Sequence, residues 1–191
     1  ERLVIFLCNK LNRKDLFRVS IANTGVNLGA HPLGKEADVI HLHWINQGFL
    51  SLKGLRQLIA TGKPIVWTLH DMWPATAICH YPGDCTKYLT ACSHCALSVP
   101  HPLWDLAVST FRQKGRVALN SITFVGCSQW IAQKAKQGKW LQSASFTSIP
   151  NPIDVSIFKP VERVVARRHF HLAEDRLFVL FAAAKLSEIR K

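Results

Sequence analysis

Short apolar runs and amphipathic segments alternate along most of the chain. Four of the apolar runs are rich in β-branched or aromatic residues and lie between turn-forming residues, which is typical of buried strands. They occupy residues 37–44, 64–70, 122–128 and 143–150. Because helices are predicted between them, the pattern predicts an α/β fold with a parallel sheet and right-handed crossovers. Residues 1–36 are less regular and hold one further candidate strand at 17–25.

Three segments between these runs are predicted to be helical. In 50–63 the apolar residues recur at the spacing of an amphipathic helix, and Gly62 supplies a stop just past its end. The segments 102–115 and 129–139 follow the same logic, and Ser128 can cap the second of them. Each helix therefore lies between two predicted strands, as a parallel sheet requires.

A Pro-rich connector interrupts this alternation at 151–160. Beyond it we predict a basic helix over 161–173 and a strand over 176–185. Domain boundaries fall in extended segments of this kind. The sequence therefore predicts one domain over 1–150, followed over 151–191 by a linker and the first strand of a second, truncated domain.

The charge of the chain is strongly positive. It carries 24 Lys and Arg against 12 Asp and Glu, a formal net charge of +12. Such an excess attracts nucleic acid, anionic lipid headgroups or phosphorylated small molecules. The positive residues are scattered without Arg-Gly repeats or zinc-finger spacing, so nucleic acid is not a predicted partner. A merely soluble surface and an anionic membrane or phosphate partner both remain open. No apolar run reaches the roughly 20 residues of a membrane span.

Polar and aromatic residues follow the predicted strands at their carboxyl ends. Ligands of doubly wound sheets bind outside these ends. An imidazole there can donate a hydrogen bond to a sugar hydroxyl or a phosphoryl oxygen, although a histidine at a strand end is also commonly structural. The residues in such positions are His43, Trp44, His70, Asp71, Ser128 and Asn151.

Four of these segments together resemble a known family. In chain order they are HLHW (41–44), WTLHDMWP (67–74), VGCSQW (125–130) and IPNPIDVSIFKP (149–160). The set is similar to the N-terminal half of family-four glycosyltransferases, which are retaining enzymes of the GT-B fold. It is most similar to bacterial polysaccharide-building members that have a Cys-rich loop after the His-Asp-x-Trp-Pro segment.

The resemblance implies a Rossmann-like, acceptor-side domain over 1–150 and the start of a Rossmann-like, donor-binding domain after it. It implies a retaining hexosyltransferase that moves a sugar from a nucleotide-sugar donor onto a growing surface glycan or lipid-linked acceptor. Such an enzyme is expected in the cytoplasm, with peripheral contact at the inner face of the membrane. Relative to the family the chain is interpreted as truncated at both ends, so this fragment alone is expected to be inactive.

The resemblance also implies roles for single residues. It places a donor-contacting histidine at the position of His70, which we take as the catalytic candidate. His43 and Trp44 are interpreted as the acceptor-side wall, although a packed strand terminus explains them equally well. Asp71 is interpreted as an orienting or capping residue, not a base. The chain has no Asp-x-Asp motif, so no catalytic divalent metal is expected.

Three residues at the end of the chain match a further family feature. A basic residue after the first strand of the second domain, and a Lys six positions later, lie near the donor diphosphate in the family. Lys185 and Lys191 have this spacing, with Arg190 adjacent. Lys at the first position gives a point charge where the usual Arg gives two-pronged phosphate contacts.

A Cys-rich stretch lies in the long irregular segment between 71 and about 103. Its spacing is C-x5-C-x6-C-x2-C, and four thiolates suit a structural, tetrahedral Zn²⁺. Two disulfides are the rival, disfavoured by the absence of a secretion signal and by the cytosolic resemblance. A structural zinc ion would hold a loop of this length in place. The predicted ligands are Cys79, Cys85, Cys92 and Cys95.

One alternative from another class stays open at this point. Positive charge and clustered cysteines also fit a zinc-stabilised module that binds nucleic acid or another polyanion and has no enzymatic activity. A catalytically silent structural fragment is a third interpretation. The transferase is the leading prediction because its support comes from an ordered set of motifs.

Overall fold

The computed structural model describes the whole chain except residues 11–12, 14, 100–103 and 183–191. The chain divides into two compact units, Glu1–Pro150 and Asn151–Lys191. Each unit is described by itself below. The first unit holds the sheet, and it carries nine of the thirteen candidate site residues.

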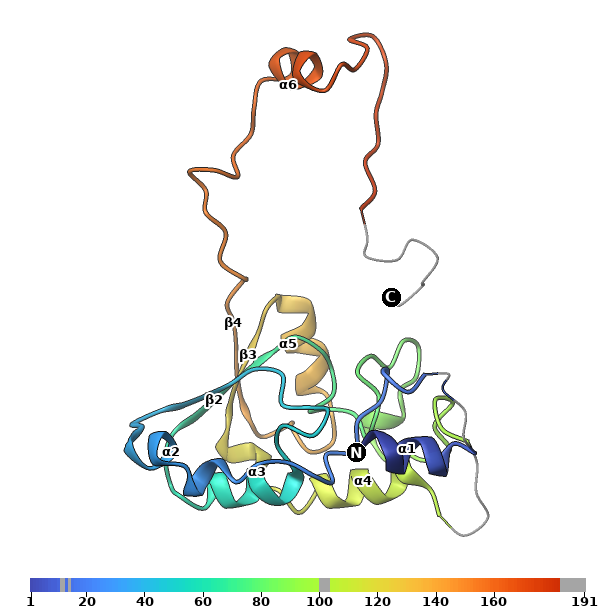
Figure 1. Ribbon diagram of the computed structural model, residues 1–191, viewed down its shortest axis with the longest axis vertical. Coiled ribbons are helices and arrows are strands. Elements are labelled where there is room, and N and C mark those ends of the chain that lie inside the picture. The colour runs from blue at the N-terminus through green and yellow to red at the C-terminus, as the bar shows by residue number, and fades with distance from the viewer. Residues whose placement is uncertain (11–12, 14, 100–103, 183–191) are drawn as a thin grey trace. The chain divides into compact units, whose positions relative to one another are not determined.

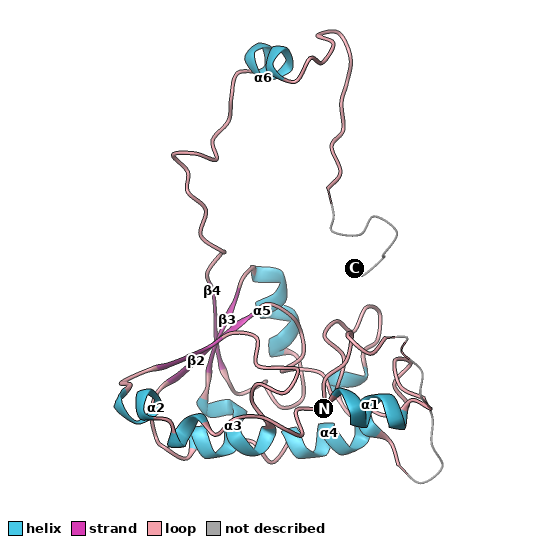
Figure 2. Ribbon diagram, viewed as in Figure 1, coloured by secondary structure: helices cyan, strands magenta, loops and turns pink. Residues whose placement is uncertain are grey.

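A four-stranded parallel sheet lies at the centre of the first unit (Figure 2). The strands pair in chain order, so every crossover joins neighbouring strands. This arrangement confirms the predicted α/β fold class. All four strands are shorter than the apolar runs that predicted them, because only part of each run pairs with a neighbour. Their bounds are β1 (Ile40–Leu42), β2 (Ile65–Leu69), β3 (Thr123–Gly126) and β4 (Ser145–Ser148).

The three predicted crossover helices are also present. Each begins at a side chain that caps its first turn, and Ser128 accepts a hydrogen bond from the Ile131 amide at 3.3 Å as predicted. Gly62, just beyond the first of these helices, has φ of +74°, a conformation that favours glycine. The helices are α3 (Leu52–Ile59), α4 (Leu106–Lys114) and α5 (Gln129–Lys136).

The N-terminal region differs from the prediction. The candidate strand at 17–25 is wrong: Val19 makes one isolated antiparallel bridge with Cys79, and no further pairs extend it. Residues 1–36 instead contain short helices, which satisfy their backbone hydrogen bonds locally and need no partner strand. These helices are α1 (Arg2–Cys8), η1 (Leu28–Ala30) and α2 (Pro32–Glu36).

The long segment after β2 is irregular, as predicted, but its first part runs through the interior. Every residue from 71 to 78 is buried. Within the segment the short helix η2 (Lys87–Leu89) is the one regular element of the described residues, and η3 (Leu119–Ser121) precedes β3. The main core lies between sheet and helices, and a smaller cluster that includes Ile78 and Phe111 packs below the Cys-rich stretch. The start of this segment is therefore fixed by packing.

Among its described residues, 151–182, the second unit contains one helix, α6 (Arg163–His169), which lies within the predicted basic segment. The strand predicted over 176–185 is not formed in its described part, 176–182. A lone strand has no neighbour to take its backbone hydrogen bonds, which accounts for this difference. None of the helices in the described part of the chain is long and apolar enough to span a bilayer.

Candidate active site

Two histidines meet where neighbouring strands end. His43 follows β1 and His70 follows β2, and the parallel pairing of these strands brings the two positions to one edge of the sheet. The His43 Nδ1 and His70 Nε2 atoms are 3.0 Å apart, within hydrogen-bonding distance. Both side chains are exposed. Both residues therefore lie at the carboxyl ends of their strands, and the structure adds that their side chains meet.

Hydrogen bonds fix the backbone beneath both imidazoles. The Trp67 indole donates to the carbonyl of His43 at 2.6 Å. The Tyr81 hydroxyl donates to the carbonyl of His70 at 2.8 Å. A third imidazole, that of His41, lies with its ring centre 4.3 Å from that of His43. The backbone beneath the pair is therefore held by one side chain from β2 and one from the segment that follows it.

Asp71 is a buried acceptor beside the histidine pair. One carboxylate oxygen accepts from the Trp44 indole at 3.0 Å, and the other accepts from the Trp73 amide at 2.9 Å. Burial raises the pKa of this carboxyl group, and the two hydrogen bonds partly oppose that rise. Because both oxygens are engaged, Asp71 is placed to orient Trp44 and the following turn.

A small hollow lies under the rim formed by these residues. It has a volume of about 10 Å³, which is room for a single water, so a sugar would have to bind on the exposed rim above it. Asn46 lines the hollow and is only 4% exposed. Its Oδ1 atom is buried and has no hydrogen-bond partner in the described part of the chain. Sequence reasoning missed Asn46, because a lone Asn after a strand carries no periodic signal.

A buried lysine holds the segment that follows Asp71. Lys114, near the end of α4, is 1% exposed and donates to the carbonyls of Trp73 and Thr76, the latter at 2.9 Å. Its Nζ atom also lies 3.3 Å from the centre of the Trp73 ring. Burial lowers the pKa of Lys114 to about 7, opposed by the charges of Cys79 and Asp71. This role could not be predicted from the sequence, because a Lys in the last turn of a helix is normally exposed.

The other predicted substrate-binding residues are not gathered at this rim. Ser128 does not line the hollow, and its hydroxyl is used to cap α5. Asn151 belongs to the second unit and is exposed. Lys185, Arg190 and Lys191 lie outside the described residues. The structure thus joins His43, Trp44, His70 and Asp71 into one site.

None of the four predicted zinc ligands forms a disulfide. Burial raises the pKa of Cys79 to about 12 and that of Cys92 to about 11, and the charges of neighbouring thiols raise both further. Burial also raises the pKa of Cys95. Across the described residues no group of three or more His, Cys, Asp or Glu side chains is placed to hold a metal ion. The zinc prediction for Cys79, Cys85, Cys92 and Cys95 therefore rests on their spacing in the sequence and stays a prediction.

Fold and site together define an α/β protein with a candidate ligand site at the carboxyl edge of a parallel sheet. The sequence profile of Glycosyltransferase Family 4 matches residues 23–157, and the chain belongs to this family. This assignment confirms the resemblance and favours a transferase over the alternative of a polyanion-binding module.

One curated relative gives a further comparison. Over 87 residues the chain is 33% identical to the putative colanic acid biosynthesis glycosyl transferase WcaC of Escherichia coli K12. The match covers 44% of this chain and 20% of that relative, so the chain matches about a fifth of its length. No solved structure matches the chain at a significant level.

Proposed function

We propose that the protein is a retaining hexosyltransferase that moves a sugar from a nucleotide-sugar donor onto a growing surface glycan or a lipid-linked acceptor. Residues 1–150 form its acceptor-side domain. The observation that carries the proposal is the His43–His70 pair, held at the carboxyl edge of the sheet in a chain of glycosyltransferase family 4. The relative named for colanic acid biosynthesis supports polysaccharide assembly as the setting.

The histidine pair can present a defined hydrogen-bond donor to substrate. When both rings are neutral, one nitrogen of the close pair must donate and the other accept. If His43 Nδ1 donates, His70 accepts at Nε2 and carries its proton on Nδ1, where it can donate to a sugar hydroxyl or a phosphoryl oxygen. His43 thereby sets the tautomer of His70, and Trp44, which is 44% exposed, offers a flat face to a sugar ring.

The proposed reaction needs no protein base. The acceptor oxygen forms its bond to the anomeric carbon on the face from which the nucleoside diphosphate leaves. The bond between that carbon and the phosphate oxygen breaks, and the acceptor proton passes to the leaving phosphate. Asp71, whose two oxygens accept from Trp44 and Trp73, is left with an orienting role. The diphosphate is held by positive side chains and helix amino ends, with no catalytic divalent metal.

The place of action that fits this chemistry is the cytoplasm, at the inner face of the membrane, where nucleotide sugars and lipid-linked acceptors meet. Release of nucleoside diphosphate from a panel of nucleotide sugars, with lipid-linked glycan acceptors, tests the proposal. We expect release from a protein that continues through the second domain and none from these 191 residues alone. Turnover by the 191 residues alone, or none by the longer protein with any donor and acceptor, would contradict it.

A further inference from the structure

A groove between two helices gathers arginines on a part of the first unit that the proposed reaction does not use. Arg56 reaches it from α3, Arg112 from the last turn of α4, and Arg116 from the turn just beyond that helix. Trp104 and Asp105, at the start of α4, line the same groove, which has a volume of about 550 Å³. We call Arg56, Trp104, Arg112 and Arg116 the arginine groove. Its volume lies within the usual range for small-molecule sites.

The positive charge of the arginine groove is not balanced within the described residues. None of the three guanidinium groups has an ion pair there: the ion pair found among these residues joins Arg18 to Asp15. Asp105 is the one carboxylate that lines the groove. Its oxygens accept from the backbone amides of Ala107, Val108 and His94, which leaves it engaged with the amino end of α4.

Structural roles do not account for this arrangement. The dipole of α4 favours a cation near its last turn, where Arg112 lies, but it gives no reason for Arg56 of another helix to converge on the same groove. Arg116 lies two residues beyond the end of α4 and lines the groove together with Arg56 and Arg112, so three like charges share one surface. Bringing three guanidinium groups together has a cost that an anionic ligand would offset.

The chemistry of the lining suits phosphate. Arginine donates in a planar fork that matches phosphate oxygens, and several arginines can share one phosphate. Trp104 is 52% exposed beside them. An amphipathic indole next to basic residues is the combination found where proteins meet the headgroup level of a bilayer. We propose that the arginine groove binds the phosphate headgroups of anionic phospholipids.

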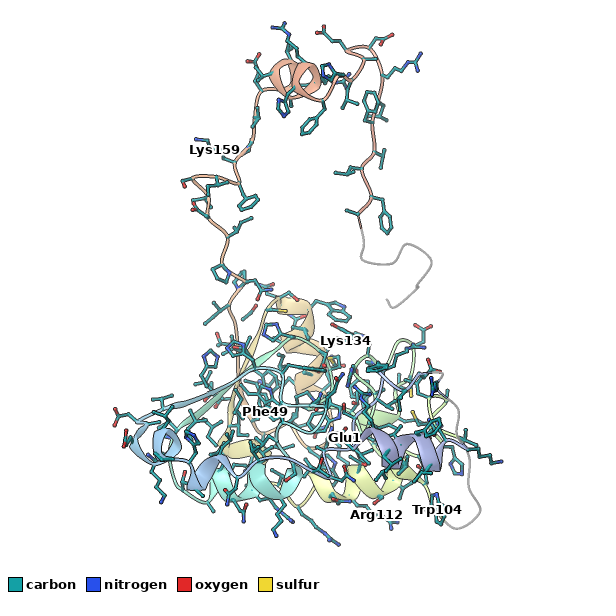
Figure 3. The ribbon with its side chains drawn as sticks, viewed as in Figure 1. Glu1, Phe49, Trp104, Arg112, Lys134 and Lys159 are labelled. Carbon is teal, nitrogen blue, oxygen red and sulfur yellow. The ribbon has the colours of Figure 1, made fainter. Side chains whose placement is uncertain are left out.

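This contact would leave the candidate active site accessible. In Figure 1, α3 and α4 lie end to end along the lower edge of the first unit. Figure 3 places Trp104 and Arg112 at that edge, with Lys134 on α5 near the opposite side. His43 and His70, by contrast, lie at the carboxyl ends of β1 and β2. The inference deepens the proposed function by naming the surface that would contact the membrane, and vesicle binding can be measured without any sugar transfer.

Co-sedimentation with vesicles tests the proposal on the 191-residue chain. The vesicles are phosphatidylcholine alone, or phosphatidylcholine with one-third phosphatidylglycerol. The groove variant is Arg112→Gln with Arg116→Gln, and its matched control is Lys134→Gln with Lys136→Gln, which removes two exposed charges from α5. Circular dichroism confirms that all proteins are folded.

We expect binding to the anionic vesicles and little to phosphatidylcholine alone. The groove variant should bind about 25-fold more weakly, because each basic residue at an anionic bilayer contributes about fivefold in affinity. The α5 control should lose much less. Equal losses in the two variants would mean that net charge drives binding, and this would overturn the proposal, as would absence of anionic-vesicle binding.

A competition experiment with inorganic phosphate distinguishes binding of lipid headgroups from binding of a free phosphate compound. Inorganic phosphate, added to the anionic vesicles at constant ionic strength, should compete only weakly, because a bilayer presents many headgroups and Trp104 has an interface to enter. Trp104→Ala should weaken vesicle binding without changing the affinity for inorganic phosphate. Tight binding of inorganic phosphate without vesicle binding would instead assign the groove to a free phosphate compound and overturn the lipid assignment. Neither result depends on whether the protein transfers sugar.

Discussion

Replacing Lys114 by Met removes the buried amine that ties α4 to the segment after Asp71. Thr76 loses the lysine donor of its carbonyl, while the Trp73 carbonyl keeps a longer contact from the Thr76 hydroxyl at 3.4 Å. A buried polar group left without a partner costs about 1–3 kcal/mol. Loss of the amine above the Trp73 ring adds a smaller amount. We therefore expect Lys114→Met to lower the free energy of unfolding by about 1–3 kcal/mol at neutral pH.

The pH dependence gives this prediction a second signature. Burial lowers the pKa of Lys114 from 10.5 to about 7, so between these values the unfolded chain binds a proton that the native protein does not. The unfolding free energy of the parent should therefore rise with pH through this interval, by at most about 1.4 kcal/mol per pH unit. Cys79 acts in the opposite direction above pH 9, because its pKa is raised from 9.0 to about 12. The window from pH 7 to 9 is therefore the informative one.

Urea unfolding followed by tryptophan fluorescence measures both effects. Lys136→Met, at an exposed position of α5, is the matched control and should change stability by less than about 0.5 kcal/mol. The free energy of unfolding of Lys114→Met should not rise from pH 7 to 9. The difference in unfolding free energy between the parent and Lys114→Met should therefore grow with pH. A Lys114→Met protein as stable as the parent at both pH values would refute the reasoning.

Two further predictions concern buried polar and thiol groups. From the cysteine spacing we expect about one zinc per chain by elemental analysis, and Cys92→Ser with Cys95→Ser should lower thermal stability, because binding energy at a structural metal is folding energy. Four metal-free thiols in freshly purified protein would contradict the zinc. Asn46→Leu removes a buried oxygen that has no partner in the described part of the chain, so thermal unfolding should show equal or greater stability, and a clear loss would reveal an internal partner.

The sequence predicted those elements whose signal is local and repeated. Apolar runs and amphipathic spacing identified the strands of the sheet and its crossover helices, and Ser128 marked the start of α5. The sequence placed His43 and His70 at the carboxyl ends of two strands, and their contact is what parallel strands that end at one edge allow. These predictions needed no knowledge of distant contacts.

The features that escaped prediction depend on partners far away in the chain. The segment 17–25 has strand-like composition but finds only one bridging partner, at Cys79. Lys114 is buried because a loop from another part of the chain covers it and accepts its hydrogen bonds. Asn46 becomes notable only once its surroundings are known to be closed. Each of these features depends on contacts between residues far apart in the sequence, and local composition does not reveal such contacts.

The most direct test of the central claim is the turnover of His70→Ala in a protein that continues through the second domain. Nucleoside-diphosphate release is measured under saturating donor and acceptor, with thermal unfolding as the check on folding. Because one positioned hydrogen bond at a reacting centre is commonly worth a hundredfold or more, kcat should fall by about that factor while the unfolding temperature is unchanged. Near-normal turnover by His70→Ala would remove the His43–His70 pair from the reaction and contradict the account.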